Sequence, residues 1–385
     1  MKPINLIIFL TVFFSIYGVV NYYIFIRGSQ ALSLASPYRL YYAIIFIVVS
    51  LSFIIGRTLE NYWLTPLSKT FVWIGSLWLA AMLYFILWIL LLDILRSLNH
   101  FIPFFPGIIT GNYALVKQIL GGVIILSVGT IIVIGHFNAI DPKIEKLHLK
   151  IQKKSQGMKS VNIVVASDIH LGSIVGKNRF DKIVAMINGL NPDIVLLPGD
   201  IVDEDLAPVI KDNLGESLRN VKPRFGVYAV TGNHEYIGGV EKACRYLEEN
   251  GVKVLRDQTI LVNHTLYLVG REDRSLSQFG GKTRKSLDEL MSKVDSTVPV
   301  ILMDHQPFRL EEAKQHNVDL QLSGHTHHGQ LWPLNFITRA VYEISWGYRR
   351  DGNTNYYVSC GVGTWGPPVR TGNRPEIVNI IMDFE

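Results

Sequence analysis

Five short apolar runs, rich in β-branched residues, each end in side chains that can bind a metal ion. They span residues 161–167, 193–198, 225–231, 298–303 and 318–322. Such runs predict buried strands. Between the first two runs, Phe180, Ile183, Val184 and Ile187 recur at the spacing of an amphipathic helix. Alternating strands and helices indicate an α/β fold, in which sites form beyond the carboxyl ends of strands, so we expect the five strand ends to meet at one site.

The residues that follow the runs are aspartate, histidine and asparagine. They are Asp168 and His170, Asp200, Asn233 and His234, His305, and finally His325 and His327. Neutral imidazole is the commonest metal ligand in proteins, and residues i and i+2 of an extended strand project to the same face. We therefore expect His325 and His327 to point into one cavity, with Gly324 allowing tight backbone geometry just before them. The alternative is a set of loop residues that cap helices or make turns.

The order of the motifs is also informative. Asp-x-His, Gly-Asp, Gly-Asn-His-Glu, a single His after a strand and Gly-His-Thr-His follow one another along the chain. This arrangement resembles the calcineurin-like metallophosphoesterases, over roughly residues 160–385. The tail is similar to the YkuE and YaeI-like branch of that family through residues 357–363, Pro367, Arg370 and residues 375–377. The resemblance implies an α/β (α+β) four-layer β-sandwich of two mixed sheets flanked by helices, and a metal-dependent phosphoric ester hydrolase.

The resemblance also implies which residues hold metal. It places one ion on Asp168, His170, Asp200 and His327, and a second on Asp200, Asn233, His305 and His325. A bridging Asp200 suits this arrangement, because a carboxylate has two oxygens and can neutralise part of the charge of two cations. In the family pattern His234 is not a ligand but faces the substrate phosphate, where it would stabilise the transition state or protonate the leaving oxygen. Oxygen and nitrogen ligands suit manganese, iron or zinc without choosing among them.

Several side chains near these positions are candidates for supporting roles. Carboxylates that could orient the ligand imidazoles are Asp203, Glu235, Asp273 and Asp304. Each could instead cap a helix or lie at the surface. A turn around Trp365, Pro367 and Arg370 is expected to border the active site, with Arg370 meeting a substrate anion.

Two residues depart from the pattern of the family. His328 stands where glycine is usual, and we expect its side chain to face outward, the alternative being a substrate contact. Cys360 stands where arginine or serine is common. Neither position is among the seven metal positions, so the departures bear on substrate choice rather than on the chemistry.

Residues 1–140 contain four apolar stretches long enough to cross a membrane, which takes about 20 residues. They cover approximately residues 4–26, 38–55, 71–94 and 115–134. The first is too long for the apolar part of a signal peptide and lacks a clear small-x-small cleavage site, so we expect an anchor. Asp93 and Arg96 lie one helical turn apart and are expected to pair, the alternative being a proton or ion path. Lipid recognition between the helices is left open.

The excess of basic residues belongs to the first 140 residues. These contain seven Lys and Arg and two acidic residues, while the remaining 30 basic and 30 acidic residues balance. A neutral second half does not favour nucleic acid, so no such partner is expected. Nine lysines and arginines flank the side of the membrane that holds both ends of the four spans, and the other side has Arg27, Arg39, Arg96 and Lys117. This bias predicts a cytoplasmic catalytic domain, although relatives in the branch include exported proteins.

The expected organisation is a membrane region over residues 1–140, a junction over residues 141–160 and a metallophosphoesterase domain over residues 161–385. In the junction, apolar and polar residues alternate as in a half-buried strand, the alternative being a lysine-rich segment that binds anionic headgroups. The expected function is hydrolysis of phosphoester or pyrophosphate bonds by an integral protein of the cell membrane, with a lipid-linked substrate favoured. The alternatives are a non-enzymatic membrane scaffold or sensor, and a nuclease.

Overall fold

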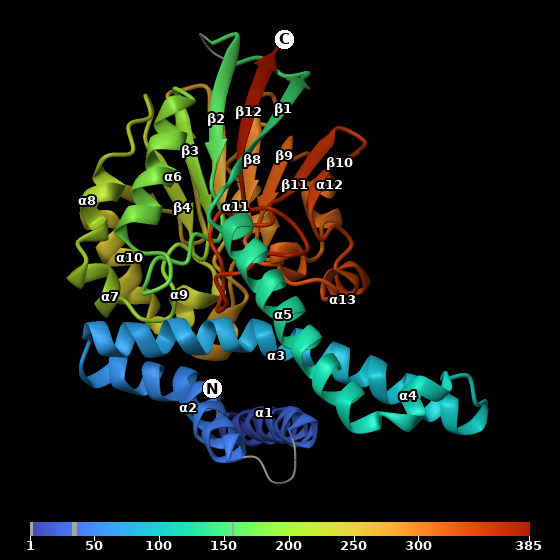
Figure 1. Cartoon of the computed structure of the whole chain (residues 1–385). Helices are drawn as coiled ribbons and strands as arrows, with labels where there is room; N and C mark the ends of the chain where they lie inside the picture. Colours follow the sequence, from blue (N-terminus) through green and yellow to red (C-terminus); the bar gives the residue numbers. More distant parts are fainter. Residues whose placement is uncertain (1–2, 33–36, 156–157) are drawn as a thin grey trace. The chain divides into compact units, whose positions relative to one another are not determined.

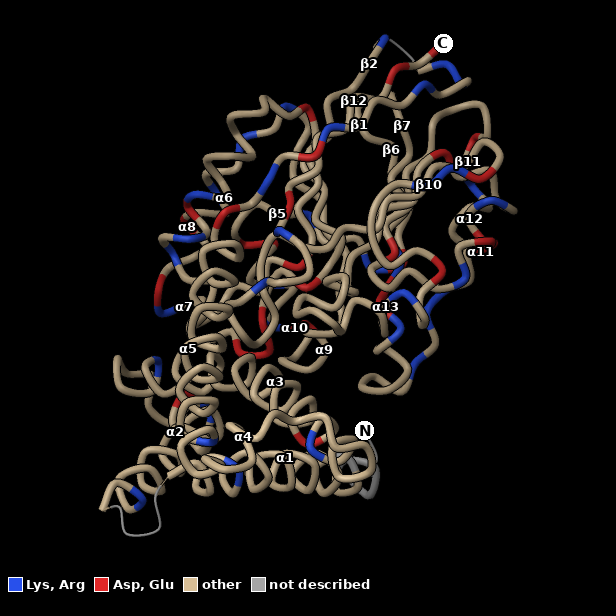
Figure 2. Tube along the Cα trace, turned by 45° about the vertical axis from the view of Figure 1, so that its right-hand side comes forward, with Lys and Arg blue, Asp and Glu red and all other residues tan. Residues whose placement is uncertain are grey.

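The computed structural model describes residues 3–32, 37–155 and 158–385 (Figure 1). The chain forms two compact units, one ending at His136 and the other beginning at Phe137. We call them the helical unit and the sheet unit and describe each by itself. Charged residues are sparse along the helices of the helical unit, whereas both signs are mixed over the sheet unit (Figure 2).

The helical unit consists of long apolar helices. They are α1 (Pro3–Ala31), α2 (Tyr38–Tyr62), α3 (Pro66–Phe101), the short α4 (Gly107–Gly111) and α5 (Tyr113–Ala139), which runs on into the sheet unit. Among the described residues, α1, α2, α3 and α5 are long and apolar enough to cross a membrane. Large apolar side chains such as Ile16, Ile45 and Leu126 are exposed on them, which suits helices surrounded by lipid. The four predicted stretches are confirmed, and the protein is a membrane protein.

Close packing of α2 against α3 depends on small residues. A Cβ atom on Gly75 would lie 2.2 Å from the backbone nitrogen of Phe53, and one on Gly56 would lie 2.5 Å from that of Val72. Ser52 is fully buried in the same unit. Small residues let helix backbones approach closely inside a membrane, where the hydrophobic effect does not drive helices together. The pair α2 and α3 is therefore a well-packed part of the helical unit.

The sheet unit contains two mixed six-stranded sheets. The first has the order β1 (Lys143–Ile151), β12 (Glu376–Phe384), β2 (Ser160–Val165), β3 (Ile194–Pro198), β4 (Val227–Val230) and β5 (Val252–Val254). The second has the order β10 (Gly347–Asp351), β11 (Thr354–Val358), β9 (Leu320–Ser323), β8 (Val300–Met303), β7 (Leu266–Gly270) and β6 (Gln258–Val262). In the first sheet β2 to β5 are parallel, and in the second β7, β8, β9 and β11 are parallel.

Helices cover the outer faces of the two sheets (Figure 1). Beside the first sheet are α6 (Lys177–Gly189), α7 (Ala207–Lys211), α8 (Leu214–Arg219), α9 (Asn233–Gly238) and α10 (Val240–Glu249). The later helices are α11 (Leu287–Met291), α12 (Glu311–Gln315) and α13 (Asn335–Val341). One core lies between the sheets, where Ile163 and Leu196 pack with Leu268 and Ile301. Separate cores lie under the helices on each side, so the predicted four-layer fold is confirmed.

The junction to the helical unit is part of the first sheet. Strand β1 pairs in parallel with the last strand of the chain, from Lys143 opposite Glu376 to Ile151 opposite Phe384. Its residues alternate between more and less buried positions and end in the buried Leu149 and Ile151. The predicted half-buried strand is therefore confirmed, because its apolar side chains complete the core between the sheets.

Candidate metal centre

The candidate site lies beyond the carboxyl ends of five strands. Asp168 and His170 follow β2, Asp200 follows β3, Asn233 and His234 begin α9 after β4, His305 follows β8, and His325 and His327 follow β9. Because β2, β3 and β4 are parallel neighbours, as are β8 and β9, their carboxyl ends reach the same edge of each sheet. His170 and His327, which are 157 positions apart, are thereby brought together.

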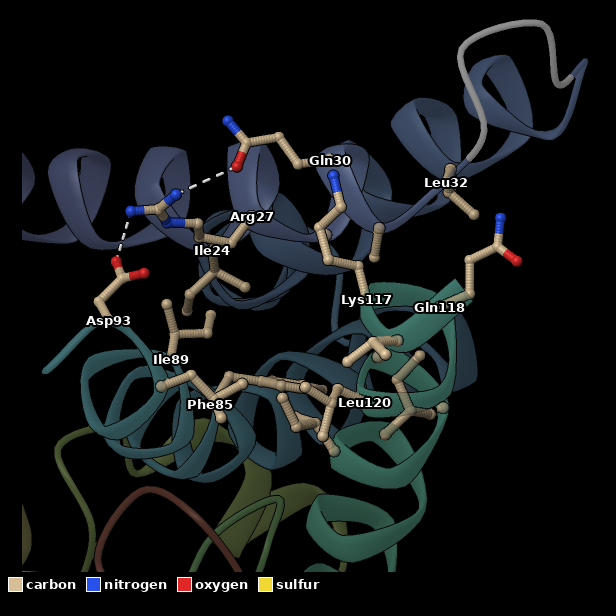
Figure 3. Close-up of a pocket in the computed structure, with 18 of the residues that line it drawn as sticks. Ile24, Arg27, Gln30, Leu32, Phe85, Ile89, Asp93, Lys117, Gln118 and Leu120 are labelled. Atoms are coloured by element: carbon tan, nitrogen blue, oxygen red, sulfur yellow. Dashed lines mark hydrogen bonds and ion pairs between the residues drawn. The ribbon is translucent and has the colours of Figure 1, made fainter. Parts of the chain in front are cut away.

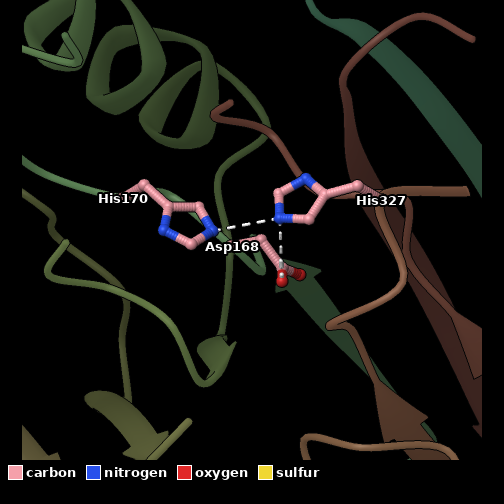
Figure 4. A group of neighbouring side chains, drawn as sticks. All are labelled: Asp168, His170 and His327. Atoms are coloured by element: carbon pink, nitrogen blue, oxygen red, sulfur yellow. Dashed lines mark hydrogen bonds and ion pairs between the residues drawn. The ribbon is translucent and has the colours of Figure 1, made fainter. Parts of the chain in front are cut away.

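Asp168, His170 and His327 form the first group of neighbouring donors (Figure 4). Nε2 of His170 lies 3.0 Å from Nε2 of His327, and the latter lies 3.6 Å from Oδ1 of Asp168. One ligand atom from each residue lies within 4.8 Å of the others. Two imidazole nitrogens and a carboxylate oxygen facing one point are a donor set that fits a divalent cation.

Asp200, His305 and His325 form the second group. Oδ2 of Asp200 lies 3.1 Å from Nε2 of His305, and the same oxygen lies 3.9 Å from Nε2 of His170 in the first group. Oδ1 of Asn233 lies 2.8 Å from Nδ1 of His325. Asp200 therefore stands between the two groups, where a bridging carboxylate would be required.

The backbone geometry at the ligand positions differs from the prediction. We expected His325 and His327 to follow an extended strand, but β9 ends at Ser323 and both histidines have left-handed φ angles of 72° and 44°. They consequently point to different groups. Asp168, His170 and Asp200 also have φ between 51° and 53°. Residues other than glycine seldom adopt this conformation, and such residues cluster at functional sites.

Two glycines allow the carboxylates to approach the backbone. A Cβ atom on Gly232 would lie 2.2 Å from Oδ1 of Asp200, and one on Gly324 would lie 2.2 Å from Oδ2 of Asp168. Because glycine has no Cβ atom, the carboxylates can come close to the backbone. The backbone N–H of His234 donates to Asp200 at 2.9 Å, and that of His325 donates to Asp168 at 2.8 Å. Each carboxylate is thus held by a main-chain donor that a side chain at the preceding glycine would displace.

Hydrogen bonding also fixes the tautomer of His305. Its Nδ1–H donates to the carbonyl of Pro198 at 2.7 Å, and its Nε2 faces Oδ2 of Asp200. Burial would lower the pKa of His305, but Asp200 raises it well above its ordinary value, so Nε2 holds a proton toward that carboxylate. With a cation in place of that proton, Nδ1 would keep its hydrogen and Nε2 would present its lone pair to the centre, as a metal ligand must. Gly199 adjoins this ring so closely that a Cβ atom there would lie 2.6 Å from Nδ1.

Electrostatics at the site favour bound cations. Burial raises the pKa of Asp168. Burial would raise the pKa of Asp200 as well, but the charge on His305 outweighs it and holds that pKa well below its ordinary value. Burial lowers the pKa of His327, and burial together with His305 lowers that of His325 to about 4. A proton on His305 thus balances the charge of Asp200, and a divalent cation would take the place of that proton.

His234 stands beside the first group. Its ring centroid lies 4.6 Å from that of His170 and 6.0 Å from that of the half-exposed Trp365. Oδ1 of Asp203 lies 3.1 Å from Nδ1 of His234 and 3.6 Å from Nδ1 of His170. Burial alone would lower the pKa of His234, but the carboxylates of Asp200 and Asp203 raise it to about 9. Asp203 thus orients two imidazoles, as sequence reasoning allowed.

The other carboxylate candidates have different roles. Glu235 accepts the backbone N–H groups of Asp200, Ile201, Val202 and Gly232, and so fixes the loop after β3. Asp304 pairs with Arg271 and Arg284. Asp273 accepts both hydrogen bonds from the side-chain amide of Gln306. These groups stabilise the segments that carry ligands rather than the imidazoles themselves.

The prediction that Arg370 meets a substrate anion is wrong. Its side chain is fully buried and donates to the carbonyls of Cys360 and Gly363, each at 2.8 Å, and to Oδ1 of Asn373. Asn373 in turn donates to the carbonyl of His327 at 2.6 Å. The tail folds around the guanidinium, so Arg370 and Asn373 position a proposed ligand instead of reaching the solvent. Sequence reasoning missed Asn373, which carries no motif signal.

The expectation for His328 is also wrong. Its side chain is 3% exposed, with Nδ1 at 3.1 Å from Oγ of Ser345 and the ring at 5.1 Å from that of Trp346. The backbone of His328 has a left-handed φ of 47° in the tight turn after β9, so its side chain points away from those of the adjacent residues. Cys360 is buried too, and its thiol donates to the carbonyl of Arg374. Both residues are therefore packing elements beneath the site.

Comparison with known proteins gives the same assignment as the geometry. The calcineurin-like phosphoesterase family matches residues 161–329. An uncharacterized metallophosphoesterase of Aquifex aeolicus is 33% identical over 245 residues, which are 63% of this chain and 92% of that protein. A transmembrane protein with metallophosphoesterase domain from Danio rerio is 33% identical over 263 residues, or 65% of this chain, and the match spans 60% of the length of that relative.

A further relative extends the match beyond the sheet unit. An uncharacterized metallophosphoesterase of Campylobacter jejuni is 27% identical over 382 residues, which are 97% of each chain, so the similarity continues through the helical unit. The matched family segment contains all seven proposed ligands and His234. The chain therefore belongs to the calcineurin-like metallophosphoesterases.

Proposed function

We propose that the protein hydrolyses phosphoester or pyrophosphate bonds at two divalent cations. In this proposal residues 161–385 form the catalytic domain, residues 1–140 the membrane region and residues 141–160 the junction. The observation that carries it is the convergence of two donor groups, in which Asp200 of the second group lies 3.9 Å from His170 of the first, with His234 beside them. Family membership supports the same chemistry.

Each residue of the site has a defined part in this proposal. Asp168, His170, His327 and Asp200 would hold one cation, and Asp200, Asn233, His305 and His325 would hold the other. Two such cations supply a hydroxide nucleophile near neutral pH and neutralise charge on the phosphoryl oxygens. The donors are oxygen and nitrogen atoms, which suits manganese, iron or zinc.

His234 is proposed as the catalytic histidine. The carboxylate of Asp203, at 3.1 Å from Nδ1, fixes the orientation of the ring, so that Nε2 is left to hold a proton toward the leaving oxygen. The indole of Trp365, 55% exposed at the edge of the site, lies edge-on to this ring at a centroid distance of 6.0 Å.

The substrate is proposed to be lipid-linked. Helices long and apolar enough to cross a bilayer confine the chain to the membrane, where phosphates of phospholipids or of nucleotide-sugar lipids are concentrated. A direct test compares lipid and water-soluble phosphoesters in the same detergent solution. Faster turnover of soluble nucleotides than of any lipid phosphoester would contradict this substrate class.

The sheet unit is proposed to face the cytoplasm at the cell membrane. The reason is that nine lysines and arginines flank the side of the membrane that holds both ends of the four spans, whereas four flank the other side. Several of the nine belong to β1, and Lys143 contacts the ring of Trp346 within the sheet unit. A reporter enzyme that is active only outside the cytoplasm, fused after Glu385, tests this orientation. The reporter should be inactive, and an active reporter would show that the proposed orientation is reversed.

The hydrolysis itself is tested with the purified full chain and bis-p-nitrophenyl phosphate. Turnover should require added manganese, stop with a chelator, and fall at least about a hundredfold in Asp200→Asn, because the shared carboxylate would be lost. Tightly bound metal without turnover on any phosphoester would favour the scaffold or sensor alternative. Cleavage of DNA in preference to small esters would favour the nuclease, for which the mixed charges of the sheet unit give little support (Figure 2).

A further inference from the structure

A cavity of about 640 Å³ lies within the helical unit, between α1, α2, α3 and α5 (Figure 3). This volume is in the range of pockets that hold small ligands. Its lining is mostly apolar and includes Trp78, Phe85, Ile89 and Leu120. Such a cavity in a membrane protein suits an acyl chain, which fills apolar space without requiring hydrogen bonds.

One rim of the cavity is polar. Figure 3 shows Arg27 and Gln30 of α1 on the same side of the cavity as Lys117 of α5, with Phe85 and Ile89 on the other side. Asp93 of α3 pairs with Arg27 at this rim. The cavity thus has the amphipathic lining that a lipid requires, with a headgroup region and an acyl-chain region.

The rim carries an excess of positive charge. Among the described residues that line the cavity, the cations are Arg27, Arg96 and Lys117, and the one carboxylate is Asp93. Arg96 lies 3.8 Å from that carboxylate, which Arg27 already contacts. Lys117 places its ammonium 5.3 Å from the ring centroid of Tyr113. Ionised groups at membrane depth are costly unless they are paired, so two excess cations point to an anionic ligand.

Chain direction places this rim in one leaflet. Arg27 is near the end of α1, Arg96 near the end of α3 and Lys117 near the start of α5. Helix α5 is long and apolar enough to cross a membrane and ends at Ala139. The rim is therefore at the end of the helical unit opposite to the end of α5.

We propose that this cavity binds one anionic phospholipid. Its phosphate would lie at Lys117, Arg96 and Arg27, and one acyl chain would lie along Trp78, Phe85 and Ile89. The bound lipid would join α5 to α1 and α3, and so connect the helix that continues into the sheet unit to the rest of the helical unit. This site is separate from the metal centre and does not depend on its activity.

Trp78 provides a direct readout, because it lines the proposed acyl-chain region. The full chain is placed in phosphatidylcholine nanodiscs that contain a small fraction of phosphatidylglycerol with brominated acyl chains, which quench nearby tryptophans. We expect stronger quenching than with the same fraction of brominated phosphatidylcholine, and we expect the difference to disappear in Trp78→Phe. Equal quenching by the two lipids in the wild-type chain would overturn the proposal.

Two pairs of variants distinguish the cavity from general attraction to a charged membrane. Lys117→Gln should weaken phosphatidylglycerol retention about fivefold, the effect of one basic residue at an anionic lipid, whereas Lys69→Gln, near the start of α3 and outside the cavity lining, should not. Gly122→Leu should fill the cavity, and Gly129→Leu serves as its control, since a Cβ atom at either glycine meets nothing within 4 Å and only Gly122 lines the cavity. Equal effects of a variant and its control would contradict the assigned site. A cavity filled by a second copy of the protein would also give this result.

Discussion

The candidate metal centre and the membrane cavity differ in the charged side chains that they gather. At the candidate metal centre, Asp168 and Asp200 are buried beside the neutral His325 and His327, and the proton on His305 that balances Asp200 is one that a cation would replace. At the cavity, three cations surround the single carboxylate of Asp93 among the described lining residues, so the site requires an anion. In both regions the charged side chains that the protein gathers indicate the chemical class of the proposed ligand.

The largest expected effect tests the metal centre. Asp200→Asn should remove the shared negative charge and abolish the binding of both ions, with turnover reduced at least about a hundredfold. Asp203→Asn should be milder, about tenfold, because Asp203 orients His170 and His234 without being a proposed ligand. Steady-state turnover of the two purified variants measures the difference, and equal losses would contradict the assigned roles.

Overpacking at a glycine should have the next largest effect. In Gly324→Ala the new methyl group would lie 2.0 Å from Oγ of Ser167 and 2.2 Å from Oδ2 of Asp168, so the variant should lose about 1–3 kcal/mol of stability and much of its activity. Gly189→Ala is the matched control, because a Cβ atom there meets nothing within 4 Å. Thermal unfolding in detergent tests this, and an unchanged midpoint for Gly324→Ala would contradict the close approach.

Arg370 distinguishes positioning from substrate binding. Arg370→Met leaves the carbonyls of Cys360 and Gly363 without their donor, which should cost about 1–3 kcal/mol, and should weaken metal retention through His327. KM should stay near the wild-type value, because the side chain is fully buried and does not face the substrate. A large rise in KM with normal metal content would restore the role in binding substrate that the sequence suggested.

Removal of the carboxylate of Asp93 should increase the excess positive charge at the rim of the cavity. Asp93→Asn leaves three cations at the rim, so phosphatidylglycerol should be retained about fivefold more tightly. Native mass spectrometry of the chain released from nanodiscs counts the bound lipid. Weaker retention in this variant would show that the pair of Asp93 with Arg27, rather than the excess charge, shapes the site.

The smallest effect concerns a surface pair in the sheet unit. Burial would lower the pKa of His316, but the carbonyl of Glu312 and the carboxylate of Asp288 raise it above its ordinary value. The pair should therefore stabilise the fold fully below about pH 6.5 and lose its effect as pH rises through the raised pKa. His316→Gln should cost only a few tenths of a kcal/mol at pH 6 and nothing at pH 9, as measured by thermal unfolding.

Local patterns were sufficient to predict much of the fold. The apolar runs before Asp168, Asp200 and His325 are strands, as predicted. They could be predicted because a pattern of alternate or continuous apolar residues is visible within a short segment of sequence. The helix from Lys177 to Gly189 buries Phe180 and Ile183 as its periodicity predicts. Parallel order then brings the strand ends together, so the predicted site residues could be found without the structure.

The errors arose where the folding of segments outside the motif itself determines the environment. Burial of Arg370 depends on the carbonyls of the tail closing around it, and burial of His328 depends on Ser345 and Trp346. Likewise, the pairing of Asp93 with Arg96 was predicted from adjacent turns, but the contact with Arg27 requires α1 to pack on α3. Sequence spacing carries no information about such long-range contacts.

Metal content and turnover measured together test the account most directly. The full chain, purified without chelator and saturated with manganese, should contain two ions per chain and hydrolyse bis-p-nitrophenyl phosphate, whereas Asp200→Asn should lose both ions and the activity in one preparation. An Asp200→Asn chain that keeps two ions and wild-type turnover would contradict the proposed dinuclear centre built around Asp200.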